Sequence, residues 1–344
     1  MKFFSIGTHA SLLEEIAGTL RLLGHIVESV SFSAHEWIFG RQPAASCGPI
    51  TKENWATSDP ATFAKWFAPR AGEFDAVIAS YPASMAMLFR DVPKPIIVYA
   101  AARYEGPWQE DAEKWGALND FLRSKRVRLA ANNRYDAGYL AHFLGRNPLL
   151  IPCRCDYVGG ARWRPYEGPL VAKTRDSKAL TLALAEVPNL RTVGSHYNFA
   201  DLARALAIVH LPYNASTMSG IEQYRMGIPL LVPTADFLMD LRREVGMLSE
   251  LSWPRTSRAW SMRPAETALA PDPNAKDEVS VRCWLHKADY YTAPGVIQFG
   301  SWEHLRELLA HANFAARSAI QQHANDVERE VALERWDDLL RELV

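Results

Sequence analysis

Short apolar runs alternate with helix-length amphipathic stretches along the first half of the chain. The apolar runs predict strands at residues 2–6, 26–30, 75–79, 95–100, 127–131 and 149–152. The amphipathic stretches predict helices at residues 11–23, 82–90 and 134–144. Strands that alternate with helices in this way are typical of a parallel sheet covered by helices on both faces.

The helix expected at 11–23 carries signals at both ends. Leu12, Ile16 and Leu20 recur at helical spacing. Ser11 and Glu14 predict a capping box at its start, and Gly24 is suited to end it.

A loop between domains is predicted at residues 156–169, which contain three glycines and two prolines. Arg154, Arg162, Trp163 and Arg164 form a basic aromatic patch here or belong to a solvated linker; both interpretations stay open.

A second alternating series follows the loop. Strands are predicted at 170–172, 190–194, 207–211 and 229–232. Helices are predicted at 177–185, 199–206 and 220–226. Residues 253–280, rich in Pro, Ser and Ala, predict a long loop, and residues 315–343 predict a charged amphipathic helix.

The predicted fold class is therefore α/β, with two Rossmann-like domains facing each other across a cleft. The expected boundaries are residues 1–158 and 159–314, with the helix of residues 315–344 after them. In open parallel sheets, ligands bind beyond the carboxyl ends of the strands, so the residues that follow each strand are the candidates for chemistry.

Composition narrows the classes of protein. The chain has 344 residues, 48% hydrophobic and 22% charged, which excludes disordered, collagen-like and coiled-coil chains. The 38 Lys plus Arg balance 39 Asp plus Glu and give no signal for nucleic-acid binding. No apolar stretch approaches the ~18 residues of a membrane span, so a cytoplasmic protein is expected.

Four cysteines are too few for a disulfide scaffold in a chain of this length. Cys153 and Cys155 form a single CxC pair, and no second pair or neighbouring His completes a zinc set. No metal site is therefore expected.

In the first half, polar side chains follow three predicted strands. His9, after Gly7, is either a general base or a residue that packs the turn or caps the helix. The other side chains are candidates for binding a polyhydroxylated or phosphorylated ligand, and the alternatives for them are a surface Arg–Glu pair and a helix cap. They are Arg103, Tyr104, Glu105, Asn133 and Asp136.

In the second half, Lys173, Arg175 and Lys178 cluster at the start of a predicted helix. Cations beside a helix N-terminus suit a diphosphate, because free N–H groups and the helix dipole add to their charge. Their alternative is three solvated basic residues. Ser195 and His196 follow the next strand and are expected to line the same cleft.

The candidate site residues lie closest together in the stretch from His210 to Val232. Its hydroxyl groups and the N–H groups of the following helix predict an anion-binding nest. Glu222 is placed to accept two ribose hydroxyls, or it closes a capping box with Ser219. The donor-side candidates of this stretch are Tyr213, Asn214, Ser216, Thr217, Met218, Ser219 and Glu222.

This stretch resembles the GT-B glycosyltransferase superfamily, in which a helix bearing a Glu precedes a Gly-x-Pro turn and an apolar strand, as in IEQYRMGIPLLVP. Gly24-His25-x-Val27 is similar to the Gly-His-x-Val of the family's second strand. The resemblance covers most of the chain. It implies an acceptor-binding first domain, a second domain that binds a nucleotide sugar, and a last helix that crosses back to the first domain.

Carried onto this sequence, the resemblance implies that Glu222 binds the donor ribose and that Ser216, Thr217 and Ser219 lie near its phosphates. Lys173 or Arg175 would neutralise the diphosphate leaving group. His9 would occupy the position of the base in inverting members, with Glu105 and Asp136 as alternatives.

One departure concerns the mechanism. Retaining members often carry a second Glu seven positions before the helix Glu, and Ala215 stands there. The chain has no Asp-x-Asp motif, which fits a metal-independent enzyme without a cofactor besides its substrate. The expected partners are a nucleotide sugar and an acceptor glycan or other hydroxyl compound. A nucleotide-sugar epimerase and a non-catalytic binding protein are the alternatives.

Overall fold

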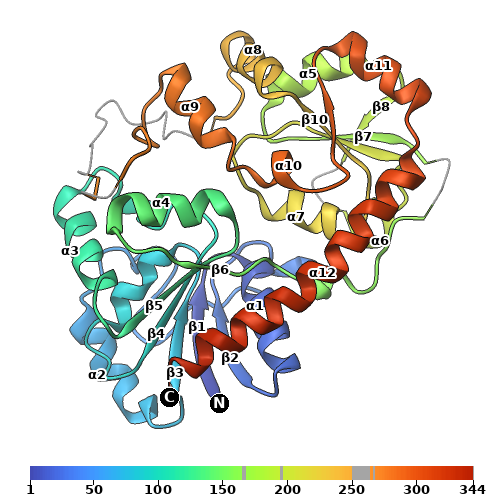
Figure 1. The fold of residues 1–344 in the computed structure, drawn as a ribbon. Coiled ribbons are helices and arrows are strands. Elements are labelled where there is room, and N and C mark those ends of the chain that lie inside the picture. The colour runs from blue at the N-terminus through green and yellow to red at the C-terminus, as the bar shows by residue number, and fades with distance from the viewer. Residues whose placement is uncertain (165–167, 194–196, 250–263, 266–267, 344) are drawn as a thin grey trace. The chain divides into compact units, whose positions relative to one another are not determined.

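The computed structural model describes residues 1–164, 168–193, 197–249, 264–265 and 268–343. The chain divides into two compact units. Unit 1 contains the described residues of Met1–Tyr157, Arg258–Ala270 and Arg329–Val344, and unit 2 contains those of Val158–Ser257 and Pro271–Glu328. Each unit contains one parallel sheet with helices along it (Figure 1).

The sheet of unit 1 has six parallel strands in the order β2-β1-β3-β4-β5-β6. Their bounds are Lys2–Gly7 (β1), Ile26–Ser31 (β2), Ala76–Ala79 (β3), Ile96–Ala100 (β4), Val127–Ala131 (β5) and Leu149–Leu150 (β6). β3 and β4 are buried throughout, which explains why they appear in the sequence as unbroken apolar runs.

The helices of unit 1 include α1 (Ala10–Leu22), α2 (Pro60–Ala71), α3 (Ala112–Leu122) and α4 (Arg134–Leu144). Asp59, Asp111 and Asn133 accept hydrogen bonds from backbone N–H groups in the first turns of α2, α3 and α4. Short 3-10 turns lie at Glu36–Phe39 (η1), Ala83–Phe89 (η2), Gly106–Trp108 (η3) and, in the segment that joins the units, Asp156–Val158 (η4).

The sheet of unit 2 has five parallel strands in the order β11-β10-β9-β7-β8. The strands are Leu170–Lys173 (β7), Leu190–Thr192 (β8), Ala207–His210 (β9), Leu230–Pro233 (β10) and Ile297–Phe299 (β11). The helices are Ser177–Glu186 (α5), Phe199–Leu202 (α6), Met218–Arg225 (α7), Ala235–Val245 (α8), Glu278–Leu285 (α9), Asp289–Thr292 (α10) and Trp302–His311 (α11). The last helix, α12 (Phe314–Arg341), contributes residues to both units.

The two sheets share one topology. In unit 1 the first strand, β1, lies between β2 and β3, and in unit 2 the first strand, β7, lies between β8 and β9. This 2-1-3-4-5 order, to which unit 1 adds a sixth strand at the end, reverses direction at the first strand. In such sheets ligands bind beyond the carboxyl ends of the strands at the reversal. The fold therefore predicts that ligand-binding residues follow β1 and β3 in unit 1 and β7 and β9 in unit 2.

The predicted α/β class with two Rossmann-like domains is confirmed by this architecture, and several local predictions are wrong. The capping box of Ser11 and Glu14 does not form, because α1 begins at Ala10 with His9 at the N-cap position. Glu14 instead forms an ion pair with Arg41 at 2.9 Å.

The helix expected at 82–90 is the 3-10 segment η2, whose residues are all buried, so it lacks the exposed face of an ordinary surface helix. The helix expected at 199–206 ends at Leu202, and the Ala205 carbonyl beyond it accepts a hydrogen bond from the Trp163 indole (2.9 Å). Residues 253–263 and 266–267 of the loop expected at 253–280 lie outside the described residues. Within that range α9 begins at Glu278.

Candidate functional site

The carboxyl edge of the unit 2 sheet brings together Lys173, the last residue of β7, and His210, the last residue of β9. The two are register partners, and the Leu211 N–H donates to the Lys173 carbonyl at 3.0 Å. From this point the chain enters the loop that leads to α7. The site therefore lies at the strand reversal of this sheet.

Lys173 belongs to a cluster of five side chains within unit 2. Its ammonium lies 4.5 Å from the ring centre of Tyr197, and the Arg175 guanidinium lies 4.9 Å from that of Tyr213. Glu222, in α7, is only 5% exposed and its negative charge acts on both Lys173 and Tyr197. The cluster of Lys173, Arg175, Tyr197, Tyr213 and Glu222 thus combines two cations, a buried carboxylate and two rings.

Burial has opposite effects on the two kinds of acid in this cluster. It lowers the pKa of the Lys173 ammonium, and the Glu222 charge works against that change. It raises the pKa of the Tyr197 phenol, and Glu222 and Tyr213 act in the same direction. A partly desolvated cation attracts an anion more strongly than a solvated one, because the local dielectric constant is lower.

His210 lies beneath the first turn of α7. Burial, with a smaller contribution from the Lys173 charge, lowers its pKa to about 4, so the imidazole is neutral at pH 7. A Cβ on Gly220 would approach the His210 ring to 3.3 Å, so the helix backbone packs directly on the imidazole. His210 therefore supports α7 and adds no positive charge to the site.

The hydroxyl-rich loop is held largely by its own side chains. The Thr217 hydroxyl caps α7 by accepting the Gly220 N–H at 3.1 Å, so the alternative capping box of Ser219 and Glu222 is wrong. The Ser216 hydroxyl donates to the Asp289 carboxylate at 3.1 Å, and the Asn214 side chain accepts the Ala215 N–H at 2.8 Å. Two of the three hydroxyls predicted to form an anion nest thus have partners within the protein.

Asp289 and Tyr290 were not identified from the sequence. They belong to the four-residue helix α10, which has too few residues to show a helical period. The Tyr290 hydroxyl donates to the Asn214 carbonyl at 3.4 Å, and its ring lies 5.9 Å from that of His210.

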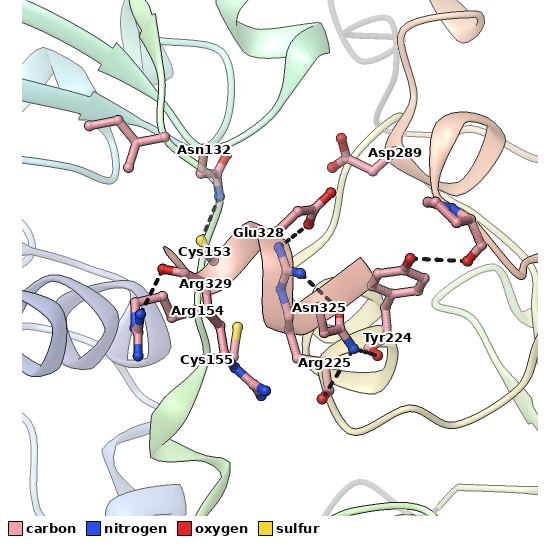
Figure 2. Close-up of polar contacts among 12 residues, drawn as sticks. Asn132, Cys153, Arg154, Cys155, Tyr224, Arg225, Asp289, Asn325, Glu328 and Arg329 are labelled. Atoms are coloured by element: carbon pink, nitrogen blue, oxygen red, sulfur yellow. Dashed lines mark hydrogen bonds and ion pairs between the residues drawn. The ribbon is translucent and has the colours of Figure 1, made fainter. Parts of the chain in front are cut away.

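The C-terminal end of α7 is fixed by α12, as Figure 2 shows. The Arg225 guanidinium, 4% exposed, forms an ion pair with Glu328 at 2.6 Å and a hydrogen bond with Asn325 at 2.8 Å. The Asn325 amide donates to the Tyr224 carbonyl at 2.8 Å. These contacts orient the helix that carries Glu222.

Gly227 explains the Gly-x-Pro turn after α7. Its φ of +74° is the left-handed conformation that glycine adopts without strain, and a Cβ would lie 2.7 Å from Gln322 Cγ. The Gly227 carbonyl accepts the Ser318 hydroxyl at 2.6 Å. No side chain larger than hydrogen fits this turn without displacement.

In unit 1, His9 and Tyr81 occupy the corresponding strand reversal. Their rings meet edge to face, with centroids 5.5 Å apart. The Thr8 N–H donates to the Tyr81 carbonyl at 2.8 Å, which ties the turn after β1 to the segment after β3. The role of His9 as a base stays a prediction.

The acceptor-side candidates lie in a buried polar network of unit 1. Arg103 donates to the Tyr135 hydroxyl at 3.2 Å, and Glu105 accepts the Tyr139 hydroxyl at 2.9 Å. The Tyr104 hydroxyl donates to Asn119 at 2.6 Å and accepts the Trp115 indole N–H at 2.9 Å. Because Arg103 and Glu105 are buried, the surface-pair interpretation of these two residues is wrong.

Asn133 and Asp136 are part of the same unit. Asn133 caps α4 by accepting the Asp136 N–H at 2.8 Å, and its amide donates to the Asp136 carboxylate. Burial raises the pKa of that carboxyl to about 6, although the Asn133 hydrogen bond and the Arg103 charge lower it. Contact of these side chains with an acceptor stays a prediction.

The remaining candidates are placed as follows. Ser195 and His196 lie outside the described residues. Lys178 is exposed on α5, while Met218 is buried at the start of α7. In the described part of the chain, no group of three or more His, Cys, Asp or Glu side chains is arranged to hold a metal ion. Among the same residues no helix has the length and apolar character needed to cross a membrane.

No family model matches the sequence, and no curated protein matches it. Solved structures do resemble it. A glycosyltransferase from Rickettsia africae is 9% identical with a TM-score of 0.53, over 99% of this chain and 96% of that one. Alr3699/HepE from Anabaena, solved in complex with UDP and glucose, is 10% identical with a TM-score of 0.53, over 99% of each chain. At these identities the likeness concerns the fold alone, and it confirms the predicted GT-B-like fold of two Rossmann-like domains.

Proposed function

We propose that this chain, which has the GT-B fold, is a glycosyltransferase that moves a sugar from a nucleoside-diphosphate donor to an acceptor hydroxyl. Unit 2 would bind the donor, and unit 1 would supply the base. The observation that carries the proposal is the cluster at the strand reversal of unit 2, where Lys173, Arg175 and the start of α7 adjoin the buried carboxylate of Glu222.

The two ends of a nucleoside diphosphate match this cluster chemically. Lys173 and Arg175 would bind the diphosphate oxygens, and the positive end of the α7 dipole would add to their charge. Glu222, acceptor-only when ionised, would receive hydrogen bonds from ribose hydroxyls. Tyr197 and Tyr213 would flank the ligand with their rings.

Rate acceleration would come from the same groups. As the bond between the sugar and the diphosphate breaks, negative charge builds up on the leaving oxygen, and cations already in place stabilise that charge. Lys173 and Arg175 would provide this stabilisation without a metal ion. In unit 1, His9 would remove the proton of the acceptor hydroxyl as it attacks.

Binding of UDP is the first test, because the structurally similar HepE was solved with UDP and glucose. A ligand that binds only the folded state raises the melting temperature, so thermal shift and titration calorimetry both report it. We expect wild-type protein to bind at least one nucleoside diphosphate. Lys173→Gln and Glu222→Gln should each weaken that binding by about tenfold or more, since each removes a charged hydrogen-bonding partner.

Matched controls are Lys276→Gln, which removes an exposed cation from the segment before α9, and Glu244→Gln, which removes an exposed carboxylate on α8. Both should bind like the wild type. His9→Ala should abolish hydrolysis and transfer of the donor while nucleotide binding stays intact. If no nucleoside diphosphate binds the wild type, the proposed function is wrong; if His9→Ala keeps full activity, His9 is not the base.

A further inference from the structure

A cavity of about 400 Å³ in unit 2 lies at the opposite edge of the sheet from the donor cluster. Its lining residues come from two segments, 160–164 and 200–204, which precede β7 and β9 respectively. The two strands are parallel, so both segments lie toward the amino ends of the strands. The donor cluster follows the carboxyl ends of the same strands, and the cavity is therefore a separate feature.

Three arginines line this cavity: Arg162, Arg164 and Arg204. The buried guanidinium of Arg225, by comparison, forms an ion pair with Glu328, whereas the three cavity arginines are exposed. Within the described residues, none of the three cavity arginines takes part in an ion pair or a hydrogen bond of its side chain. Asp201, three residues before Arg204, instead accepts a hydrogen bond from Asn198 at 2.6 Å.

The backbone that carries the arginines is firmly held. Trp163, buried between the exposed Arg162 and Arg164, donates its indole N–H to the Ala205 carbonyl at 2.9 Å, and its backbone N–H donates to the Met226 carbonyl at 2.8 Å. Gly168 lies so close to Arg204 that a Cβ there would be 1.8 Å from the Arg204 carbonyl oxygen. The Leu206 N–H donates to the Pro169 carbonyl at 3.0 Å.

We propose that this cavity is a second anion site, which binds a phosphate group carrying two or more negative charges. Arg162, Arg164 and Arg204 line one concave surface, and the N–H forks of guanidinium groups match the geometry of phosphate oxygens. Like charges brought together repel, and an anion between them removes that repulsion. The phosphate belongs either to a soluble phosphorylated compound or to a lipid headgroup, which offer the same chemistry to the arginines.

The test uses inorganic pyrophosphate in titration calorimetry at low salt, because exposed charges are screened at high ionic strength. The donor cluster would also bind this ion under the proposed function, so the measurement is made in the Lys173→Gln/Arg175→Gln protein. In that background one binding site should remain. Adding Arg162→Gln, Arg164→Gln and Arg204→Gln should weaken it by about tenfold or more, since charge-assisted hydrogen bonds to three cations are lost.

The matched control in the same background is Arg191→Gln/Arg317→Gln/Lys65→Gln, which removes the same formal charge from exposed positions away from the cavity. It should bind pyrophosphate like its parent. Equal affinity for pyrophosphate in the cavity variant and the control variant would overturn the proposal. It would also be overturned if the parent protein bound neither pyrophosphate nor vesicles.

A second arm distinguishes the sources of the phosphate. Co-sedimentation with phosphatidic acid vesicles, against vesicles of phosphatidylcholine alone, should show capture that the cavity variant loses if the ligand is a headgroup. Pyrophosphate binding without vesicle capture indicates a soluble ligand. UDP binding by the cavity variant in the otherwise wild-type chain should be unchanged, so failure of the cavity proposal and failure of the donor-site proposal give different results.

Discussion

Asp136→Asn should stabilise unit 1 at neutral pH, because the wild-type carboxyl is buried where its charge is poorly solvated. Burial raises its pKa from 3.8 to about 6. In the unfolded chain the carboxyl loses its proton near 3.8, so the folded state binds the proton more tightly than the unfolded state. Stability from this group is therefore complete below pH 3.8 and is lost as the pH rises through 6.

The size of the effect follows from the two pKa values. The interval between 3.8 and about 6 corresponds to about 3 kcal/mol at pH 7, at ~1.4 kcal/mol for each pH unit. Asparagine reproduces the shape of the protonated acid and keeps an oxygen that accepts the Asn133 amide. We expect Asp136→Asn to gain up to about 3 kcal/mol at pH 7.5 and little at pH near 4.

The assay is urea unfolding of both proteins from pH 4 to pH 7.5, followed by hydrogen-exchange mass spectrometry of peptides from β5 and α4. Because the chain has two units, a peptide from unit 1 reports the relevant transition where a whole-protein signal mixes two. Asp120→Asn, an exposed aspartate of α3, is the control and should leave the pH profile unchanged. Parallel pH profiles for the wild type and Asp136→Asn would refute the reasoning.

Three further outcomes are expected. The pKa of His210 is about 4 in the folded state and 6.5 ordinarily, so the stability that unit 2 has above pH 6.5 should fall by about 3 kcal/mol as the pH drops toward 4. His210→Gln should remove this loss in a pH series of melting curves. A loss that persists in the variant would contradict the prediction. Thr217→Ala should lower the free energy of unfolding by about 1 kcal/mol, because the cap of α7 is lost, and Thr217→Ser should lower it much less. Urea unfolding measures both. Equal losses would show that the hydroxyl does not cap the helix. Gly227→Ala should destabilise unit 2 by more than about 1 kcal/mol, because alanine is strained at positive φ and its Cβ meets Gln322. Gly18→Ala in α1, where a Cβ has no neighbour within 4 Å, should stabilise unit 1 by roughly 0.5–1 kcal/mol. Similar melting temperatures for the two variants would contradict this prediction.

Hydrophobic pattern was sufficient to predict most of the strands. β1, β3 and β4 are short apolar runs between turn residues, and the sequence placed each within two residues of its observed bounds. Their order in the sheet could not be predicted this way, since parallel strands of similar composition carry no signal for their neighbours. The strand reversals at β1 and β7 came only from the structure.

Several helices were missed although their caps are visible in the sequence. Asp59-Pro60 and Thr234 begin α2 and α8, which hold buried residues on one face. A prediction that uses the hydrophobic pattern without the capping residues favours the most apolar stretches. It therefore misses α8, which has several charged residues.

The candidate site was predictable in part. Lys173, Arg175 and Glu222 were expected near one another because the ends of parallel strands meet at one edge of a sheet. The contacts that orient them come from distant parts of the chain: Asp289 binds Ser216, and Asn325 and Glu328 bind Arg225. A single sequence contains no signal for pairs that are separated by 73 positions or more and whose members show no motif.

The most direct test of the donor site is a hydrogen-exchange footprint of the wild-type protein with and without saturating UDP. The account predicts slower amide exchange in peptides that cover the end of β7 with the start of α5, and in those that cover the loop from β9 into α7. Peptides from the amino ends of the same strands, around Arg162 and Arg204, should exchange at unchanged rates. Protection that is absent from the β7 and β9 ends, with UDP shown to be bound, would place the nucleotide elsewhere and contradict the central claim.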